Sequence, residues 1–158
     1  MDNRAGELVA ILKSKGLTVS TAESLTGGLI GASIVEISGA SSVFNGGAIT
    51  YTEKSKIEVL GVNPATVEKH TVVSEAVASE MALGARALYK SDIAVSATGI
   101  AGPDGGSEEF PVGLVYIGVA NQGGVRAYRY IFDGDRAAVR RQTVSKAIEL
   151  MIAEAKKE

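Results

Sequence analysis

Residues 21–28, TAESLTGG, concentrate three hydroxyls, a carboxylate and two glycines in one short stretch. Ser24 is a candidate nucleophile, because a serine hydroxyl beside a base can attack the carbonyl carbon of an amide. It could equally cap the helix that follows. Glu23 could bond backbone N–H groups of the turn or contact a substrate. Backbone N–H groups for a developing oxyanion could come from the residues that follow, Thr26, Gly27 and Gly28.

A nucleophilic serine needs a proton acceptor. The only histidine, His70, lies in a polar segment and is interpreted as a surface residue. Lys54 and Lys56 both follow a strand pattern closely, and apolar periodicity does not separate them. Because an unperturbed lysine has a pKa of about 10.4, it can act as a base near neutral pH only if burial or nearby cations lower that value. Tyr51 could relay or orient the proton, or it could form the aromatic edge of the core with its hydroxyl bonded to backbone.

A second glycine-rich segment, residues 98–106 (TGIAGPDGG), follows another strand pattern. Its spacing matches neither the Walker motif nor the dinucleotide fingerprint. We expect Thr98, Gly99 and Gly102 to line a substrate pocket. Their backbone N–H groups would lie near an amide oxygen or a phosphate of the substrate. The alternative interpretation is an ordinary long connection between strands.

Arginines cluster where the last helix begins, at Arg136, Arg140 and Arg141. The helix macrodipole disfavours cations at this end. Their position is explained if one or two of them bind an anion such as a substrate phosphate. An ion pair with Asp133, Asp135 or a neighbouring subunit would explain it as well.

Composition limits the function classes. We expect residues 1–158 to form one domain. The chain has no cysteine, which excludes disulfides and thiolate zinc sites. A net charge of -2, with 16 basic and 18 acidic residues, provides no basic stripe for nucleic acid. We find neither a membrane-spanning apolar run nor a secretory signal, so we expect a cytoplasmic protein that contacts neither nucleic acid nor membrane.

The elements that must position these residues follow from the hydrophobic pattern. Strands are expected at 17–20, 43–51 and 93–98, and as a hairpin at 114–119 and 125–132. Helices are expected at 5–15, 27–37, 54–60 and 75–89, and again from about residue 136, with a further turn or two after Pro64. Alternating strands and helices with a terminal hairpin predict a three-layer α/β/α domain. Its sheet should be mixed, mainly parallel, and have about five strands.

Four segments together resemble the CinA carboxyl-terminal domain family. They are residues 21–28, Tyr51 with Lys56, residues 98–106, and residues 134–141 with GDR followed by VRR. The resemblance covers nearly the whole chain and is closest to the stand-alone form of the family. One departure is Leu25, where many relatives carry cysteine, and we expect little chemical consequence because the serine before it is kept.

The resemblance implies a hydrolase without metal or cofactor that converts nicotinamide mononucleotide to nicotinate mononucleotide and ammonia. It selects Lys56 over Lys54 as the base, Ser24 as the nucleophile and Tyr51 as their partner. It further implies a pyridine nucleotide as substrate, and we expect a homo-oligomer. The alternative is a regulatory domain that binds a pyridine nucleotide with little or no turnover.

Overall fold

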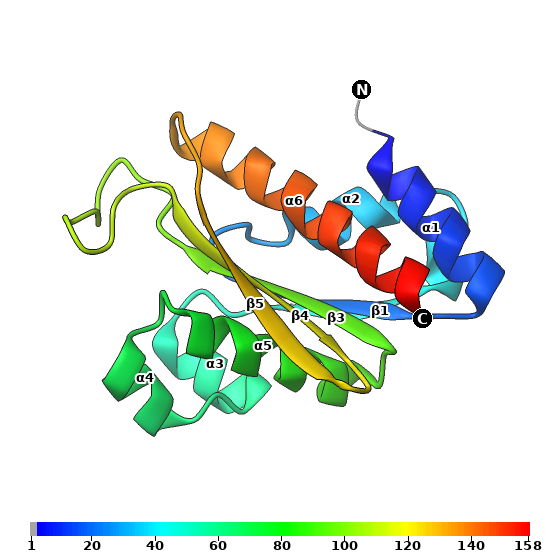
Figure 1. The fold of residues 1–158 in the computed structure, drawn as a ribbon, viewed down its shortest axis with the longest axis horizontal. Coiled ribbons are helices and arrows are strands. Elements are labelled where there is room, and N and C mark those ends of the chain that lie inside the picture. Colours follow the sequence, from blue (N-terminus) through cyan, green and yellow to red (C-terminus); the bar gives the residue numbers. More distant parts are fainter. Residues whose placement is uncertain (1–2) are drawn as a thin grey trace.

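A five-stranded sheet forms the centre of the computed structural model, which describes residues 3–158 (Figure 1). The strands lie in the order β2-β1-β3-β4-β5. Both neighbours of β1 run parallel to it, whereas β3–β4 and β4–β5 are antiparallel pairs. The strands are β1 (Val19–Glu23), β2 (Phe44–Ile49), β3 (Ile93–Gly99), β4 (Leu114–Asn121) and β5 (Gly124–Ile131).

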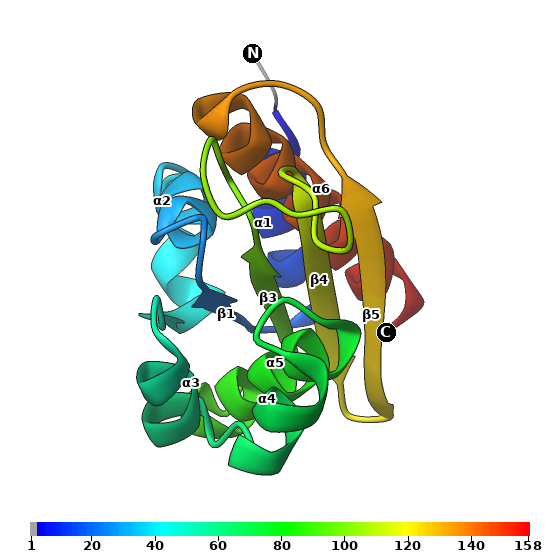
Figure 2. The same cartoon turned by 90° about the vertical axis from the view of Figure 1, so that its left-hand side faces the viewer.

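Helices cover both faces of this sheet (Figure 2). One layer contains α1 (Arg4–Lys15), α2 (Leu29–Val35) and α6 (Arg136–Lys157), and a short 3-10 turn, η1 (Ala40–Ser42), precedes β2. The other layer contains α3 (Glu53–Leu60), α4 (Pro64–His70) and α5 (Glu75–Tyr89). The predicted α/β/α layering with a mixed five-stranded sheet is therefore confirmed, with parallel and antiparallel pairings equal in number.

Each helical layer buries its own apolar cluster against the sheet. Leu8, Ile34 and Met151 belong to the cluster under α1, α2 and α6, and Val77 and Met81 belong to the one under α5. Strands β1 and β3 lie at the centre and are almost entirely buried. This burial explains why they consist mainly of small and β-branched residues. The central strands therefore form a rigid base for the turns that follow them.

Two boundaries near the candidate site differ from the sequence expectation. The first strand continues to Glu23, because residues 19–23 pair with strands on both sides. Ser24 is thus the first residue beyond a central strand. Helix α2 begins only at Leu29, because Gly27 and Gly28 have φ angles of +57° and +101° and make a turn first.

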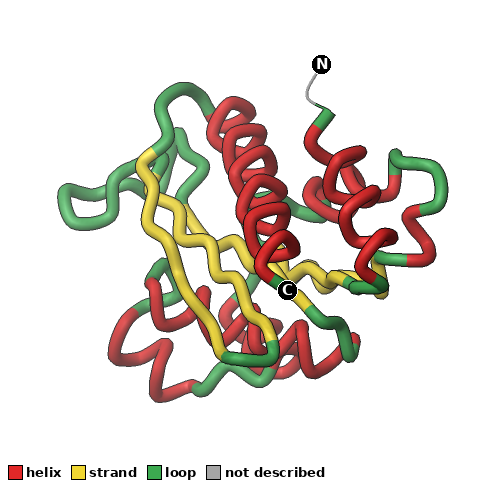
Figure 3. The backbone as a smooth tube through the Cα atoms, turned by 45° about the vertical axis from the view of Figure 1, so that its right-hand side comes forward, coloured by secondary structure: helices red, strands yellow, loops and turns green. Residues whose placement is uncertain are grey.

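The long connection between β3 and β4, residues 100–113, contains neither helix nor strand and projects outward beyond the end of the sheet (Figure 3). Among residues 3–158, no helix has both the length and the apolar character needed to cross a membrane.

Candidate active site

Three parallel strands end at the same edge of the sheet, and the candidate residues follow those ends. Ser24 comes directly after β1, Tyr51 comes two residues after β2, and Thr98 and Gly99 end β3. The chain leaves β1 through one helical layer and β2 through the other, which makes this edge a topological switch point. A cavity of about 260 Å³ lies there. Its lining comprises Ser24, Leu25, Tyr51, Glu53, Lys56, Val72, Val73, Thr98, Gly99, Ala101 and Arg136.

The shortest contact between reactive groups in this cavity joins Ser24 and Lys56. The Lys56 amine lies 2.9 Å from the Ser24 hydroxyl oxygen and donates to the Thr50 carbonyl at 2.7 Å. Lys56 is 2 % exposed and Ser24 8 % exposed. A nucleophile and a base within hydrogen-bond reach of one another meet the first geometric requirement for covalent catalysis.

The environment of the amine changes its acidity. Burial lowers the pKa of Lys56 from 10.5 to about 8, because desolvation disfavours the charged form. Within residues 3–158, Lys56 forms no ion pair with a carboxylate that would reverse this effect. Lys54, the alternative that the sequence pattern left open, is exposed and pairs with Glu58 at 3.9 Å. Geometry therefore separates two lysines that periodicity could not.

The start of α3 explains how a lysine becomes buried here. Thr52 caps the helix, and Ser55 completes a capping box, so the first turn is fixed relative to the end of β2. Lys56 and Leu60, one turn apart, are the two buried residues of α3. Lys56 thus occupies a position on the buried face of the helix, where an apolar side chain would be expected.

Glu23 holds the turn rather than the pocket. Its carboxylate is 2 % exposed and accepts hydrogen bonds from the hydroxyls of Thr21 and Thr26. It also accepts from three backbone N–H groups at the start of α2, those of Gly28, Ile30 and Gly31, at 3.2, 2.9 and 3.0 Å. These contacts favour the first of the two alternatives for Glu23, which is that it holds the turn. A contact of Glu23 with substrate stays a prediction.

Of the three expected oxyanion donors, Thr26 keeps a free N–H group within residues 3–158 of this structure, whereas Gly27 and Gly28 do not. The Gly27 N–H donates to the Ser24 carbonyl at 3.0 Å, and the Gly28 N–H already donates to Glu23. The N–H groups of Leu25 and Thr26 form no hydrogen bond within the part of the chain that the structure describes. The available donors thus lie one or two residues closer to the nucleophile than the glycines did in the sequence interpretation.

Tyr51 lines the cavity but contacts Arg136. Its ring is 60 % exposed, and its hydroxyl accepts a hydrogen bond from the Arg136 guanidinium at 3.0 Å. The same guanidinium donates to the Gly102 carbonyl at 2.9 Å and so links the end of β2 to the glycine-rich loop. The interpretation of Tyr51 as an aromatic edge of the core is therefore wrong. In this structure its hydroxyl bonds neither Ser24 nor Lys56.

The remaining predicted residues surround the cavity at different depths. The buried Thr98 hydroxyl donates to the Val72 carbonyl at 2.9 Å, so its proton is not free for a substrate. Gly99 lines the cavity, whereas Gly102 contributes its carbonyl to Arg136. Arg140 donates to the carbonyls of Leu25 and Thr26 at 2.8 and 3.3 Å and thereby braces the turn after the nucleophile.

Arg136 and Arg140 do not form, within residues 3–158, the intrachain ion pairs that the sequence left open. Within the described residues, neither Arg136 nor Arg140 pairs with Asp133, Asp135 or any other carboxylate. Both line a second cavity of about 670 Å³ that shares Ala101 and Arg136 with the first. Arg141 lies elsewhere, in a surface hollow beside Phe132.

Sequence reasoning missed several residues of the cavity wall. Val72 and Val73 come from the loop before α5, and Leu25, Glu53 and Ala101 complete the lining. The available signal was an apolar Val-Val pair directly before the helix cap Ser74, in a segment that otherwise looks like a polar connection.

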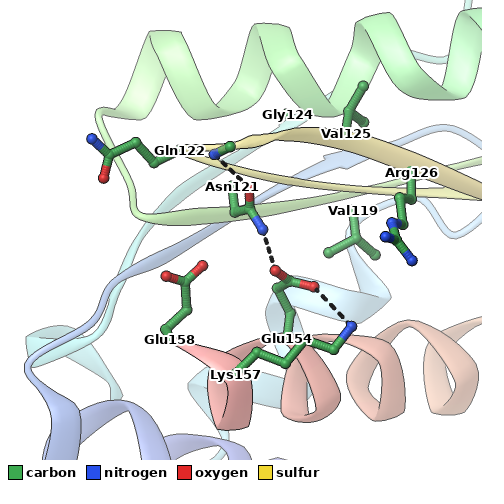
Figure 4. A pocket seen from close by; sticks show the side chains of 10 residues that line it. Val119, Asn121, Gln122, Gly124, Val125, Arg126, Glu154, Lys157 and Glu158 are labelled. Carbon is green, nitrogen blue, oxygen red and sulfur yellow. Dashed lines mark hydrogen bonds and ion pairs between the residues drawn. The ribbon is translucent and has the colours of Figure 1, made fainter.

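A cavity of about 650 Å³ at the other end of the sheet contains none of the candidate residues. It lies between the β4–β5 hairpin and the end of α6 (Figure 4). There Asn121 donates to Glu154, which also pairs with Lys157 at 3.9 Å. Asn121, Glu154 and Lys157 thus form one connected polar group in this cavity.

Comparison with known proteins identifies a family whose model matches this chain. The model of the CinA C-terminal domain matches residues 1–155. A nicotinamide-nucleotide amidohydrolase PncC from Enterobacter agglomerans is 47% identical over 149 residues, which cover 94% of this chain and 91% of that protein. A CinA-like protein from Geobacter sp. is 48% identical over 89% of this chain but only 33% of its own length.

Several of the curated relatives are longer proteins, and the chain spans about a third of their length. Among solved structures, a CinA superfamily protein from Klebsiella pneumoniae superposes with a TM-score of 0.95 at 31% identity. That match covers 99% of this chain and 98% of the other.

Proposed function

Because the chain belongs to the CinA C-terminal domain family, we propose that it is an amidohydrolase that converts nicotinamide mononucleotide to nicotinate mononucleotide and ammonia. The observation that carries this proposal is the buried Lys56 amine 2.9 Å from the Ser24 hydroxyl oxygen, with its pKa lowered to about 8. The similarity to proteins named nicotinamide-nucleotide amidohydrolase supports the choice of substrate.

In the proposed reaction, the neutral Lys56 amine takes the Ser24 hydroxyl proton while the Ser24 oxygen attacks the carboxamide carbon. With a pKa of about 8, about a tenth of the amines are neutral at pH 7. The Thr50 carbonyl accepts one amine proton at 2.7 Å, which leaves the lone pair free to face Ser24. Lys56 therefore has both the acidity and the orientation that a general base requires.

Attack on the carboxamide forms a tetrahedral intermediate with a negative oxygen. The free N–H groups of Leu25 and Thr26 follow the nucleophile directly and are the donors that we assign to this oxyanion. The protonated Lys56 then gives its proton to the departing nitrogen, and ammonia leaves. Water hydrolyses the resulting Ser24 ester, which releases nicotinate mononucleotide and restores the serine.

The two neighbouring cavities support a mononucleotide substrate. A volume of about 260 Å³ lies below the usual range of about 300–1,000 Å³ for ligand pockets, so the inner cavity suits a ring with its carboxamide. The outer cavity of about 670 Å³ has room for the ribose phosphate. Arg136 and Arg140 line it without a carboxylate partner, and we propose them as the phosphate-binding residues.

Substitution of the nucleophile tests the proposal. We expect Ser24→Ala to lower ammonia release from nicotinamide mononucleotide by about 10³-fold or more, because no acyl-enzyme can form. The matched control is Ser20→Ala, which removes a buried β1 serine whose hydroxyl bonds Ser91 at 2.7 Å, away from the cavity. Retained turnover in Ser24→Ala would remove the nucleophile assignment. Wild-type protein that binds the nucleotide but releases no ammonia would instead favour a regulatory binding domain.

A further inference from the structure

The loop that joins α4 to α5 contains an unusual backbone conformation next to the candidate site. Thr71 has φ +66° and ψ 168°, a region that is populated almost only by glycine. A β-branched residue is especially unfavourable at positive φ. Such a conformation persists only where neighbouring contacts hold it, and it is found mainly at functional sites.

The structure contains those contacts. The Thr71 N–H donates to the Val67 carbonyl at 2.8 Å, and the Thr71 carbonyl accepts from the Ser74 hydroxyl at 2.8 Å. Ser74 also caps α5, and the Val72 carbonyl accepts from Thr98 at the end of β3. The segment is therefore attached to both flanking helices and to the sheet.

The consequence is the placement of two apolar side chains. Val72 and Val73 line the cavity that also contains Ser24 and Lys56. Valine has few rotamers and no polar atoms, so the two side chains present a stiff surface without hydrogen-bonding groups. The other charged side chains that line this cavity are Glu53 and Arg136, and both belong to exposed residues.

We propose that Val72 and Val73 form an apolar wall that receives the flat heteroaromatic ring of the substrate and keeps water away from the Lys56 amine, with Thr71 as the positioning residue. The ring-binding half rests on the function proposed above, whereas the exclusion of water does not. The wall would favour carboxamides on a planar ring over aliphatic amides. A flat ring next to the reacting carbonyl packs against an apolar surface over its whole face.

Thr71→Gly separates a positioning role from a merely structural one, because the two predicted effects have opposite signs. Glycine relieves the unfavourable φ, so we expect Tm to rise by about 2–4 °C. The freed loop holds Val72 and Val73 less firmly, and we expect kcat/KM for nicotinamide mononucleotide to fall by about tenfold. The matched control is Lys90→Gly, at the end of α5 and outside the cavity, where φ is also positive at +50°. It should leave kcat/KM unchanged.

A second variant, Val73→Ala, opens the wall without changing its backbone. The measurement that does not depend on turnover is the titration of Lys56, followed by NMR on protein with labelled lysine. We expect the Lys56 pKa to move upward from about 8, toward the ordinary lysine value, in both Thr71→Gly and Val73→Ala, but not in Lys90→Gly.

An unchanged Lys56 titration in both wall variants would overturn the proposal, as would an unchanged kcat/KM in an active enzyme. If the wild type releases no ammonia while the wall variants still shift the Lys56 titration, the proposed reaction fails and the water-excluding wall stands.

Discussion

Two buried ionisable side chains flank Ser24, and the protein surrounds them in opposite ways. Glu23, on the turn side, accepts five hydrogen bonds, three of them from backbone N–H groups at the start of α2. Lys56, on the α3 side, contacts two uncharged oxygens, those of Ser24 and Thr50. Both oxygens of the Glu23 carboxylate thus have hydrogen-bond donors, whereas the Lys56 amine has no charged partner among the described residues.

Under the proposed function, this difference assigns Glu23 to holding the turn and Lys56 to the chemistry. Glu23 accepts five hydrogen bonds from the turn and the start of α2, and these contacts hold both its side chain and the turn in place. An amine that loses water without gaining an anion is pushed toward its neutral, basic form. Incomplete compensation of one buried group, next to a completely compensated one, is the arrangement expected at a catalytic site.

Removal of the amine should have the largest effect. We expect Lys56→Met to lower the rate of ammonia release by about 10⁴-fold, because no group near Ser24 can then accept its proton. Lys56→Arg should be similarly inactive, since a guanidinium stays protonated at any usable pH. Lys54→Met, an exposed change on the same helix, is the control and should keep full activity. An active Arg variant would assign the base to another group.

Substitution of the Glu23 carboxylate should lower the stability of the fold. We expect Glu23→Gln to lower the free energy of unfolding by about 3–5 kcal/mol, because the amide NH₂ would face N–H and O–H donors that the carboxylate now satisfies. Chemical denaturation measures the effect, with the exposed Glu58→Gln as control. If Glu23→Gln instead left stability intact and removed activity alone, the contrast between anchor and base would be incorrect.

The comparison also predicts how stability depends on pH. The folded-state pKa of Lys56 is about 8 and the unfolded value is about 10.4, so between these values the unfolded chain binds more protons. The stability of the wild type relative to Lys56→Met should therefore rise with pH, by about 2–3 kcal/mol between pH 7 and pH 10. Denaturation of both proteins at each pH measures this difference. A constant difference would mean that the amine is not desolvated in solution.

The sequence predicted the fold well because its signals are local. The apolar stretch of β3 and the periodicity of α5 both depend on residues close together in the chain, and both elements lie where they were expected. Lys56 could not be distinguished from Lys54 by pattern alone, because its burial depends on how α3 meets the end of β2. The resemblance to a family, rather than periodicity, identified it.

Other parts of the site depend on contacts between distant segments, which a pattern does not contain. The role of Glu23 depends on N–H groups up to eight residues away, and the Val72–Thr98 bond joins residues 26 apart. Arg136 reaches Tyr51 across 85 residues. The sequence pattern correctly placed hydroxyls and glycines at the ends of the parallel strands. It could not show which of their polar atoms already form hydrogen bonds within the protein.

The smallest expected effect concerns Tyr51, which lines the cavity but bonds neither Glu23 nor Lys56 in this structure. Its hydroxyl accepts from Arg136 at 3.0 Å and bonds no atom of Lys56, so it does not control the acidity of the amine in this arrangement. If Tyr51 only orients Arg136 toward a phosphate, Tyr51→Phe should raise KM about tenfold and leave kcat unchanged. If it relays the proton between Ser24 and Lys56, kcat should fall instead.

A double-mutant cycle with Arg136→Lys distinguishes these outcomes. Coupling between the two changes in KM supports the orienting role, because the hydrogen bond between the two side chains is then what the substrate requires. A fall in kcat in Tyr51→Phe alone, with no coupling to Arg136→Lys, would place the tyrosine beside the base during turnover. It would also require the Tyr51 ring to leave Arg136 and turn into the cavity when substrate binds.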